Sequence, residues 1–255
     1  MVAEENNAAN LVASDASEKI EIEFYDPKTG DSLGSEINLE ADYLYVSDIE
    51  NIPDYSISNS EGDIGGELKK VFRKSENKGY YREYVEYVVK KSMFKGIGFS
   101  LKNNGIIGTR DIFIDMDIIV DGDVNQITIK DQLKLNAPTK DRDNIFSISI
   151  NDLGLSPNEN LQIDGSEKNW KANFEIRALQ PKRNVKSRQQ IFIGAQSSCS
   201  VIISAKIFAD ILPEPLVQRL VIHLAVNSIT VTSEEILKEV GFTTPLSSKD
   251  NAFLQ

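Results

Sequence analysis

The chain has 255 residues, and 28 Lys and Arg against 39 Asp and Glu give it a net charge of -11. That charge repels phosphate backbones and anionic membranes unless a local basic face overrides it. The single cysteine excludes an internal disulfide and a zinc site built on paired cysteines. No apolar run approaches the roughly 20 residues that cross a bilayer, and residues 1–18 lack the pattern of a signal peptide. We therefore expect a cytoplasmic protein that uses no membrane.

The first 77 residues contain a polar tail followed by short strands. Residues 1–18 carry little apolar surface to bury and are expected to be a disordered tail. In KIEIEFY (19–25), apolar and acidic residues alternate, as they do in a half-buried strand. After the turn DPKTGD, SLGSEINL (32–39) is expected to return as the hairpin partner, and YLYV (43–46) to form a third short strand. We treat residues 47–77 as a connection.

A long helix and a series of strands follow. Aromatic and apolar side chains recur at three- and four-residue steps in NKGYYREYVEYVVKKSMF (77–94), which predicts the one long helix. Alternating segments then predict the strands DIFIDMDIIV, NQITI, NIFSISI, WKANFEIRA, QIFIG, CSVIISAKIF and LVQRLVIHLAV. SEEILKEV (233–240) predicts a short final helix, capped by Thr232 or Ser233 and with acids in its first turn.

This pattern predicts a mainly β protein, an immunoglobulin-like antiparallel β-sandwich with one long helix and a short C-terminal helix. The chain divides into a tail (1–18), a hairpin with connecting segment and helix (19–95), a β-sandwich (96–232), and a short helix with tail (233–255).

The stretch LKNNGIIGTR between two predicted strands has two readings. Asn103, Asn104, Gly105 and Gly108 tolerate positive φ and would let the chain reverse as a simple corner. A phosphate-binding loop is the alternative, but that loop is followed by a helix whose N-terminus faces the anion. A predicted strand follows Gly108 instead. We therefore favour the corner.

Clustered acids around residue 120 raise a metal hypothesis. The four acids are Asp115, Asp117, Asp121 and Asp123. An EF-hand loop would require glycine where Gln126 stands and a bidentate glutamate where Gln132 stands. An acidic edge strand that discourages strand-to-strand aggregation explains the same residues more simply. We expect no metal and no other cofactor.

The lone histidine and the lone cysteine both lie in predicted strands. His223 shares a face with Val221 and Ala225, which favours a packed or half-exposed position on a sheet over a catalytic role. Cys199 shares a face with Val201 and Ile203, so we expect a buried thiol. No serine or cysteine stands in a glycine elbow, and we expect that the protein is not an enzyme.

One basic concentration, PKRNVKSRQQ, is expected to form a hairpin loop before IFIGA. Its basic residues are Lys182, Arg183, Lys186 and Arg188. On so acidic a protein, such a cluster could engage phosphate or an acidic partner surface, although charged loops are common and this one lacks aromatic residues for base stacking. With Asn103, Asn104 and Arg110 of the corner, these residues are the candidate binding site.

Two segments resemble known families. LKNNGIIGTRDIFIDMDI resembles the strand, Asn-x-Gly corner and strand of bacterial immunoglobulin-like modules. IFIGAQSSCSVIISAKIFADILPEPLVQRLVIHLAV is similar to the C-terminal β-rich region that follows the AlbA-type, Schlafen-like ATP-binding or DNA-binding domain of some bacterial regulators, as are the early hairpin and the tyrosine-rich helix. The nucleotide- or DNA-binding domain itself is not in this chain. The resemblance implies an accessory module of a bacterial regulatory or defence complex, with no catalytic residue carried over.

Two hypotheses for function follow. The first is a non-enzymatic β-sandwich that binds a protein partner or effector subunit through exposed edges and loops. The alternative is a nucleic-acid-associated accessory protein that uses the basic loop. A hydrolase or metal enzyme is the third reading and has no set of residues to support it. Oligomeric state is left open by the sequence.

Overall fold

The structure is a computed structural model. It describes residues 20–56, 76–121, 127–131, 133, 135–141, 161–166 and 169–242. The chain forms two compact units. Unit 1 contains residues 1–43, 93–134 and 154–228, and unit 2 contains residues 44–92, 135–153 and 229–255. Segments distant in sequence therefore alternate between the units. The predicted strand NIFSISI lies outside the described residues, and the predicted domain limits stay predictions.

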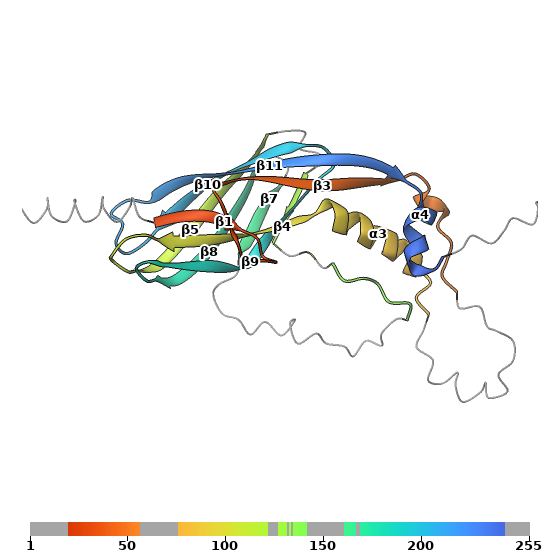
Figure 1. Cartoon of the computed structure of the whole chain (residues 1–255), viewed down its shortest axis with the longest axis horizontal. Coiled ribbons are helices and arrows are strands. Elements are labelled where there is room, and N and C mark those ends of the chain that lie inside the picture. Colours follow the sequence, from red (N-terminus) through yellow and green to blue (C-terminus); the bar gives the residue numbers. More distant parts are fainter. Residues whose placement is uncertain are drawn as a thin grey trace, which may run out of the picture. The chain divides into compact units, whose positions relative to one another are not determined.

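The described strands form two β-sheets (Figure 1). The five-stranded sheet has the order β2-β1-β4-β9-β6, and its strands are β2 (Ser32–Gly34), β1 (Ile20–Tyr25), β4 (Lys95–Asn103), β9 (Arg183–Ala195) and β6 (Ile127–Lys130). The six-stranded sheet has the order β3-β11-β10-β5-β8-β7, and its strands are β3 (Glu36–Val46), β11 (Leu216–Val231), β10 (Cys199–Phe208), β5 (Thr109–Asp121), β8 (Asn169–Leu179) and β7 (Gln162–Ser166). The mainly β, sandwich-like prediction is confirmed.

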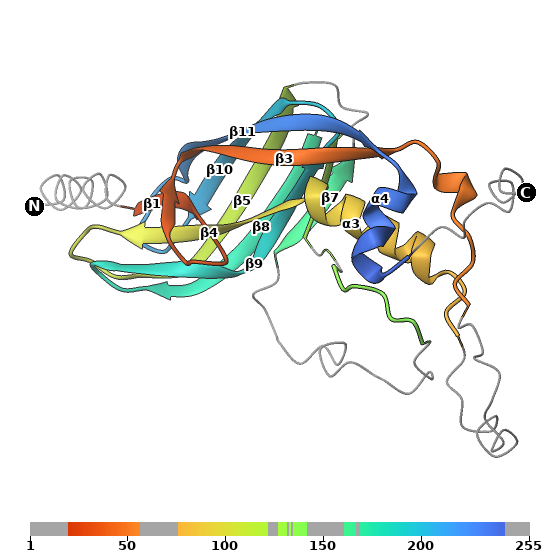
Figure 2. The ribbon, with the colours of Figure 1, turned by 45° about the vertical axis from the view of Figure 1, so that its right-hand side comes forward.

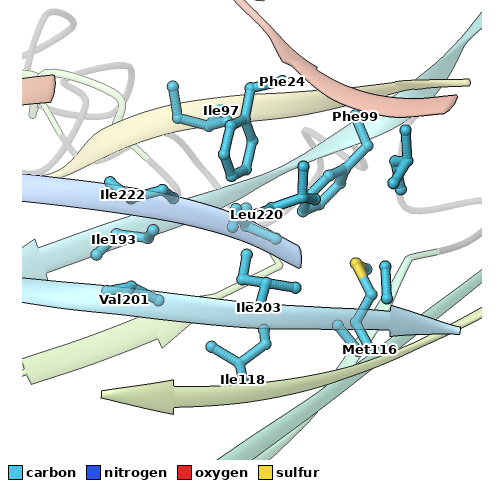
Figure 3. Close-up of a cluster of buried hydrophobic side chains, with 14 of the residues drawn as sticks. Phe24, Ile97, Phe99, Met116, Ile118, Ile193, Val201, Ile203, Leu220 and Ile222 are labelled. Atoms are coloured by element: carbon cyan, nitrogen blue, oxygen red, sulfur yellow. The ribbon is translucent and has the colours of Figure 1, made fainter. Parts of the chain in front are cut away.

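The two sheets of unit 1 enclose one hydrophobic core, because alternate side chains of each strand point inward. Figure 3 shows Phe24, Ile97, Phe99 and Ile193 from the five-stranded sheet meeting Met116, Ile118, Val201, Ile203, Leu220 and Ile222 from the six-stranded sheet. The rings of Phe99 and Phe174 stack with centroids 5.9 Å apart across this core. The inward face predicted for DIFIDMDIIV is therefore confirmed, and Cys199 is buried beside it as predicted.

Two strand assignments from the sequence need correction. SLGSEINL does not return as a single hairpin partner: β2 pairs with β1, whereas the residues after Ser35 enter β3 of the other sheet. The predicted short strand YLYV is the end of this eleven-residue strand. The sequence shows alternation in both sheets alike, so it does not reveal where the chain crosses between them.

The acidic edge predicted for β5 is wrong. β5 lies inside its sheet, between β10 and β8. Asp117 is 3.0 Å from Lys206 Nζ on one neighbour and 4.0 Å from Lys171 Nζ on the other. The carboxylate thus completes a cross-strand ion pair on the outer face, and its hydrogen bond to Lys206 is the main reason that the pKa of this lysine is raised.

Unit 2 is built around the long helix α3 (Tyr80–Met93), whose last residue already belongs to unit 1. Val85 is fully buried against Ile236 and Leu237 of the short helix α4 (Ser233–Leu237), which lies beside α3 in Figure 2. The long predicted helix is confirmed. The predicted final helix 233–240 is α-helical only to Leu237, and its last three residues form the 3-10 turn η4 (Lys238–Val240). A second 3-10 turn, η1 (Ile49–Asn51), lies in the segment that was predicted to be a connection.

Of the two residues predicted as the N-cap of α4, Thr232 is the one that caps it. Its hydroxyl accepts a hydrogen bond from the backbone of Glu235, and the Glu235 carboxylate accepts one from the Thr232 backbone at 2.8 Å. This reciprocal capping box satisfies two N–H groups that the helix itself leaves unpaired. Among the described residues, no helix combines the length and the apolar character required to cross a membrane.

Candidate binding site

The corner between β4 and β5 is held by the side chain of Asn103. Its Oδ1 accepts from the Gly105 backbone at 2.8 Å, and its Nδ2 donates to the carbonyl of Ile107 at 2.7 Å. Asn103 is buried, so these bonds are shielded from water. The corner interpretation is supported, with a different mechanism: the positive φ angles in the described chain do not fall on Asn103, Asn104, Gly105 or Gly108.

The predicted hairpin loop around Lys182 is wrong in two respects. β8 and β9 belong to different sheets, so their connection is not a hairpin. β9 begins at Arg183, and only Gln180 to Lys182 form the connection. Lys182 itself occupies the left-handed region, with φ of 56°. Three of the four basic candidates therefore lie on a strand.

The structure joins the two candidate loops. Lys182 Nζ donates a hydrogen bond to the backbone carbonyl of Asn104. Arg183 is the register partner of Asn103 in the β4–β9 ladder. A Cβ at Gly108 would stand 3.4 Å from the Pro181 ring, which shows how closely the two connections approach. Residues as much as 78 positions apart in the sequence thus form one surface.

Lys186 and Arg188 lie further along β9, away from this surface. Lys186 Nζ donates to the carbonyl of Gly30 at 2.5 Å and stands 5.2 Å from the centre of the Tyr25 ring. The Tyr25 hydroxyl in turn donates to the carbonyl of Ser187 at 2.7 Å. Lys186 therefore fastens the β1–β2 turn to β9. Arg188 is exposed where the β4–β9 register shifts.

Arg110 is positioned by an aspartate that the sequence did not indicate. Asp210 Oδ1 accepts from the Arg110 backbone at 2.9 Å and from the Thr109 hydroxyl at 2.7 Å. These hydrogen bonds are the main cause of the lowered pKa of Asp210. The carboxylate fixes the start of β5 and leaves the Arg110 side chain exposed.

Apolar side chains stand exposed at the same end of unit 1. Ile106 is 76% exposed and Ile107 is 41% exposed, although isoleucine is among the most often buried residue types. On β5 and β10, the half-exposed rings of the register partners Phe113 and Phe208 pack with centroids 6.0 Å apart. We call Asn104, Ile106, Ile107, Arg110, Lys182 and Arg183 the corner surface. It combines apolar groups with three cationic side chains.

A second feature lies on the outer face of the six-stranded sheet. Ser200 Oγ is 3.1 Å from His223 Nδ1, and His223 Nε2 is 2.9 Å from Glu36 Oε1. Ser200 and His223 are register partners in β10 and β11, which explains their contact. The His223 side chain is 44% exposed, which confirms the prediction of a half-exposed position on a sheet. The arrangement could pass a proton between Ser200 and Glu36.

Ser200 and His223 line a shallow depression of about 490 Å³. Its lining includes Cys199, Asp121 and Glu40 besides Ser200 and His223. Burial raises the pKa of Cys199, so its thiol is a poor nucleophile. Within the described part of the chain, no three His, Cys, Asp or Glu residues gather as they would around a metal ion. The sequence gives no sign of the contact with Glu36, which lies 187 positions from His223. Ser200 lies on the preceding strand, β10, and its contact depends on the register of the β10–β11 pair.

The fold places the chain in the broad class of mainly β proteins with two facing sheets. Searches with protein families and with curated proteins find no match. Several solved structures are similar to this chain, and the following three each match with a TM-score of 0.25 or less.

A protein described as "AvmM Catalyzes Macrocyclization in Alchivemycin A Biosynthesis" matches at TM-score 0.24 and 8% identity, over 52% of this chain and 80% of that chain. The CooA pilin subunit from enterotoxigenic Escherichia coli matches at 0.25 and 10% identity, over 81% and 98%. The collagen-binding domain of a Staphylococcus aureus adhesin matches at 0.25 and 11% identity, over 52% and 95%. Matches with TM-scores this low carry no information about the function of this chain.

Proposed function

We propose that the chain is a non-enzymatic binding module that contacts a protein partner through the corner surface. One observation carries this proposal: Ile106, at 76% exposure, stands on a turn that hydrogen bonds hold in one conformation. Ile107, its neighbour in the chain, is 41% exposed, and the two side chains belong to a surface with three cationic side chains. Exposed apolar groups rimmed by polar residues are typical of a binding surface. A stable complex would bury about 1,200 to 2,000 Å² in total.

The charge of the corner surface defines the partner. Arg110, Lys182 and Arg183 bring positive charge to a chain whose net charge is -11. Acidic side chains around an apolar patch on the partner would complement this arrangement, since interfaces combine an apolar centre with a polar rim. We propose a cytoplasmic protein partner of that kind, an effector of a bacterial regulatory or defence complex, and we retain the immunoglobulin-like classification within this proposal.

Nucleic acid is the weaker alternative for the same residues. Lys182 and Lys186 both donate to backbone carbonyls and so already have internal partners. Phosphate binding would have to compete with these bonds. The two readings differ in salt dependence, because binding to a phosphate backbone weakens steeply as salt rises. If changing all four basic residues to alanine removed a strongly salt-dependent affinity for nucleic acid, the alternative would replace our proposal.

Site-specific photocrosslinking in the native cells tests the proposal. A photoreactive residue replaces Ile106 in one variant and Val217 in the control, which is 58% exposed on β11. We expect a discrete crosslinked protein only from position 106, and its loss when Lys182 and Arg183 are changed to glutamate. Equal labelling from both positions, or binding to anionic vesicles without any crosslinked protein, would contradict a specific protein partner.

A further inference from the structure

Two tyrosine rings of unit 2 lie close to a lysine ammonium group. Tyr55 and Tyr80 have centroids 5.2 Å apart and ring planes inclined by 62°. Lys140 Nζ lies 5.6 Å from the centre of Tyr55 and 5.8 Å from that of Tyr80. Both distances lie within the roughly 6 Å over which a cation and a ring face attract one another. We call Tyr55 and Tyr80 the tyrosine wedge.

The wedge is built into the start of α3. Tyr80 is the first residue of the helix and is buried, and its backbone N–H donates to the carbonyl of Asn77 at 3.0 Å. Tyr55 is placed by its own backbone N–H, which donates to the carbonyl of Lys78 at 2.9 Å. Tyr81 also packs against Tyr55, in an edge-on contact with centroids 5.3 Å apart. The two rings are therefore positioned without any help from Lys140.

Lys140 reaches the wedge from a separate segment. Asn77 holds that segment, because its backbone donates to the Lys140 carbonyl at 2.9 Å and its Nδ2 donates to the Thr139 carbonyl at 3.2 Å. The same Nδ2 donates to Glu83 of α3 at 2.7 Å. Lys140 as a residue is exposed. A cation from solution could thus take the place of its ammonium group without opening the core.

The rings keep the electronic character that cation binding needs. Burial, followed by the neighbouring Tyr55, raises the pKa of Tyr80. The phenol of this wedge ring therefore stays protonated across the physiological range. Lys91 provides an internal comparison, because its ammonium lies 5.5 Å from the Tyr87 ring alone. Two inclined rings bind a cation better than one, since each contributes a negative face.

We propose that the tyrosine wedge is a binding site for an alkylammonium group, and that Lys140 occupies it within the same chain and competes with the ligand. A methylated ammonium suits this site best, because it is weakly hydrated and loses little water when the rings enclose it. The group could come from a small molecule or from a methylated lysine of a protein. The site is independent of the corner surface and of the function proposed for it.

Titration of the whole chain with tetramethylammonium chloride, followed by NMR of the tyrosine ring protons at constant ionic strength, tests the site. Lys140→Met removes the competing charge while keeping the side chain long. We expect it to tighten binding by about 2- to 30-fold relative to the unchanged protein. Lys91→Met is the matched control and should leave the affinity unchanged. Tyr55→Leu in the Lys140→Met background should abolish binding.

Further ligands test whether binding depends on the positive charge of the ligand, and whether the ligand is a small molecule or a protein. The neutral alcohol 3,3-dimethylbutan-1-ol has nearly the shape of choline and should not bind, whereas choline should. A peptide with trimethyllysine that binds more tightly than choline would assign the site to a protein ligand, and the reverse order would assign it to a small molecule. If Lys140→Met and Lys91→Met bind tetramethylammonium equally, or if the alcohol binds as well as choline, the proposal is wrong. Near-ultraviolet circular dichroism verifies that each variant is folded.

Discussion

Lys182 donates a hydrogen bond from its Nζ to the backbone carbonyl of Asn104, and so links the two connections that the sequence marked separately as candidate sites. One connection joins β4 to β5 and the other joins β8 to β9, and each crosses from one sheet to the other. The corner surface therefore depends on the closed sandwich rather than on either loop alone. Cationic and exposed apolar side chains from different parts of the chain thus lie on one surface.

We expect Asn103→Ala to destabilise the protein by about 1 to 3 kcal/mol, because it leaves the Gly105 N–H and the Ile107 carbonyl without a buried partner. Urea unfolding followed by circular dichroism measures this free energy. Asn104→Ala is the matched control: Asn104 is exposed and offers only its backbone carbonyl to Lys182, so the cost should be within about 0.5 kcal/mol. Equal costs at the two positions would show that the side chain of Asn103 does not hold the corner.

Gly98→Ala should also destabilise the sandwich, by about 1 to 3 kcal/mol. A Cβ at this position would lie 2.1 Å from Cε1 of Tyr25, so the ring must move. The Tyr25 hydroxyl would then lose its 2.7 Å hydrogen bond to the Ser187 carbonyl. Gly108→Ala serves as control, because the nearest atom to its Cβ is 3.4 Å away in ordinary contact. A shift of the thermal midpoint for Gly98→Ala no larger than that of the control would refute the close approach.

The carboxylate of Asp210 should make stability depend on acid pH. Its hydrogen bonds lower its pKa in the folded protein below the ordinary value of 3.8. The stabilisation is therefore fully present above the unfolded pKa and disappears as the pH falls through the folded pKa. Asp210→Asn should be less stable than the unchanged protein at pH 6, and the difference should narrow towards pH 2. A difference that stays constant across this range in urea unfolding would exclude the carboxylate as the cause.

We expect no esterase activity from Ser200, despite its contact with His223. β10 pairs with strands on both sides at Ser200, so the ladders use the backbone N–H groups that could otherwise stabilise an oxyanion. Glu36 is also 68% exposed, which weakens its hold on the imidazole. Hydrolysis of p-nitrophenyl acetate should be the same for the unchanged protein, Ser200→Ala and Ser204→Ala. Activity lost only in Ser200→Ala would overturn the non-enzymatic assignment.

The sequence by itself determined the local structure of most elements. Alternation at Ile112 to Val120 placed one face of β5 in the core, because successive side chains of a strand point to opposite faces. The three- and four-residue spacing around Val85 placed the buried face of α3, and Thr232 marked the start of α4. These features depend on neighbours within a few residues, so the pattern alone reveals them.

Only the tertiary structure decided which strands share a sheet and which loops meet. Alternation has the same period in both sheets, so nothing local shows that Leu33 and Ile37 belong to different ones, or that β5 is a central strand. The contacts of Lys182 with Asn104 and of Lys140 with Tyr55 join residues that are more than 75 positions apart. Such contacts arise when packing brings distant strands and loops together, and no pattern within a short segment specifies the partner.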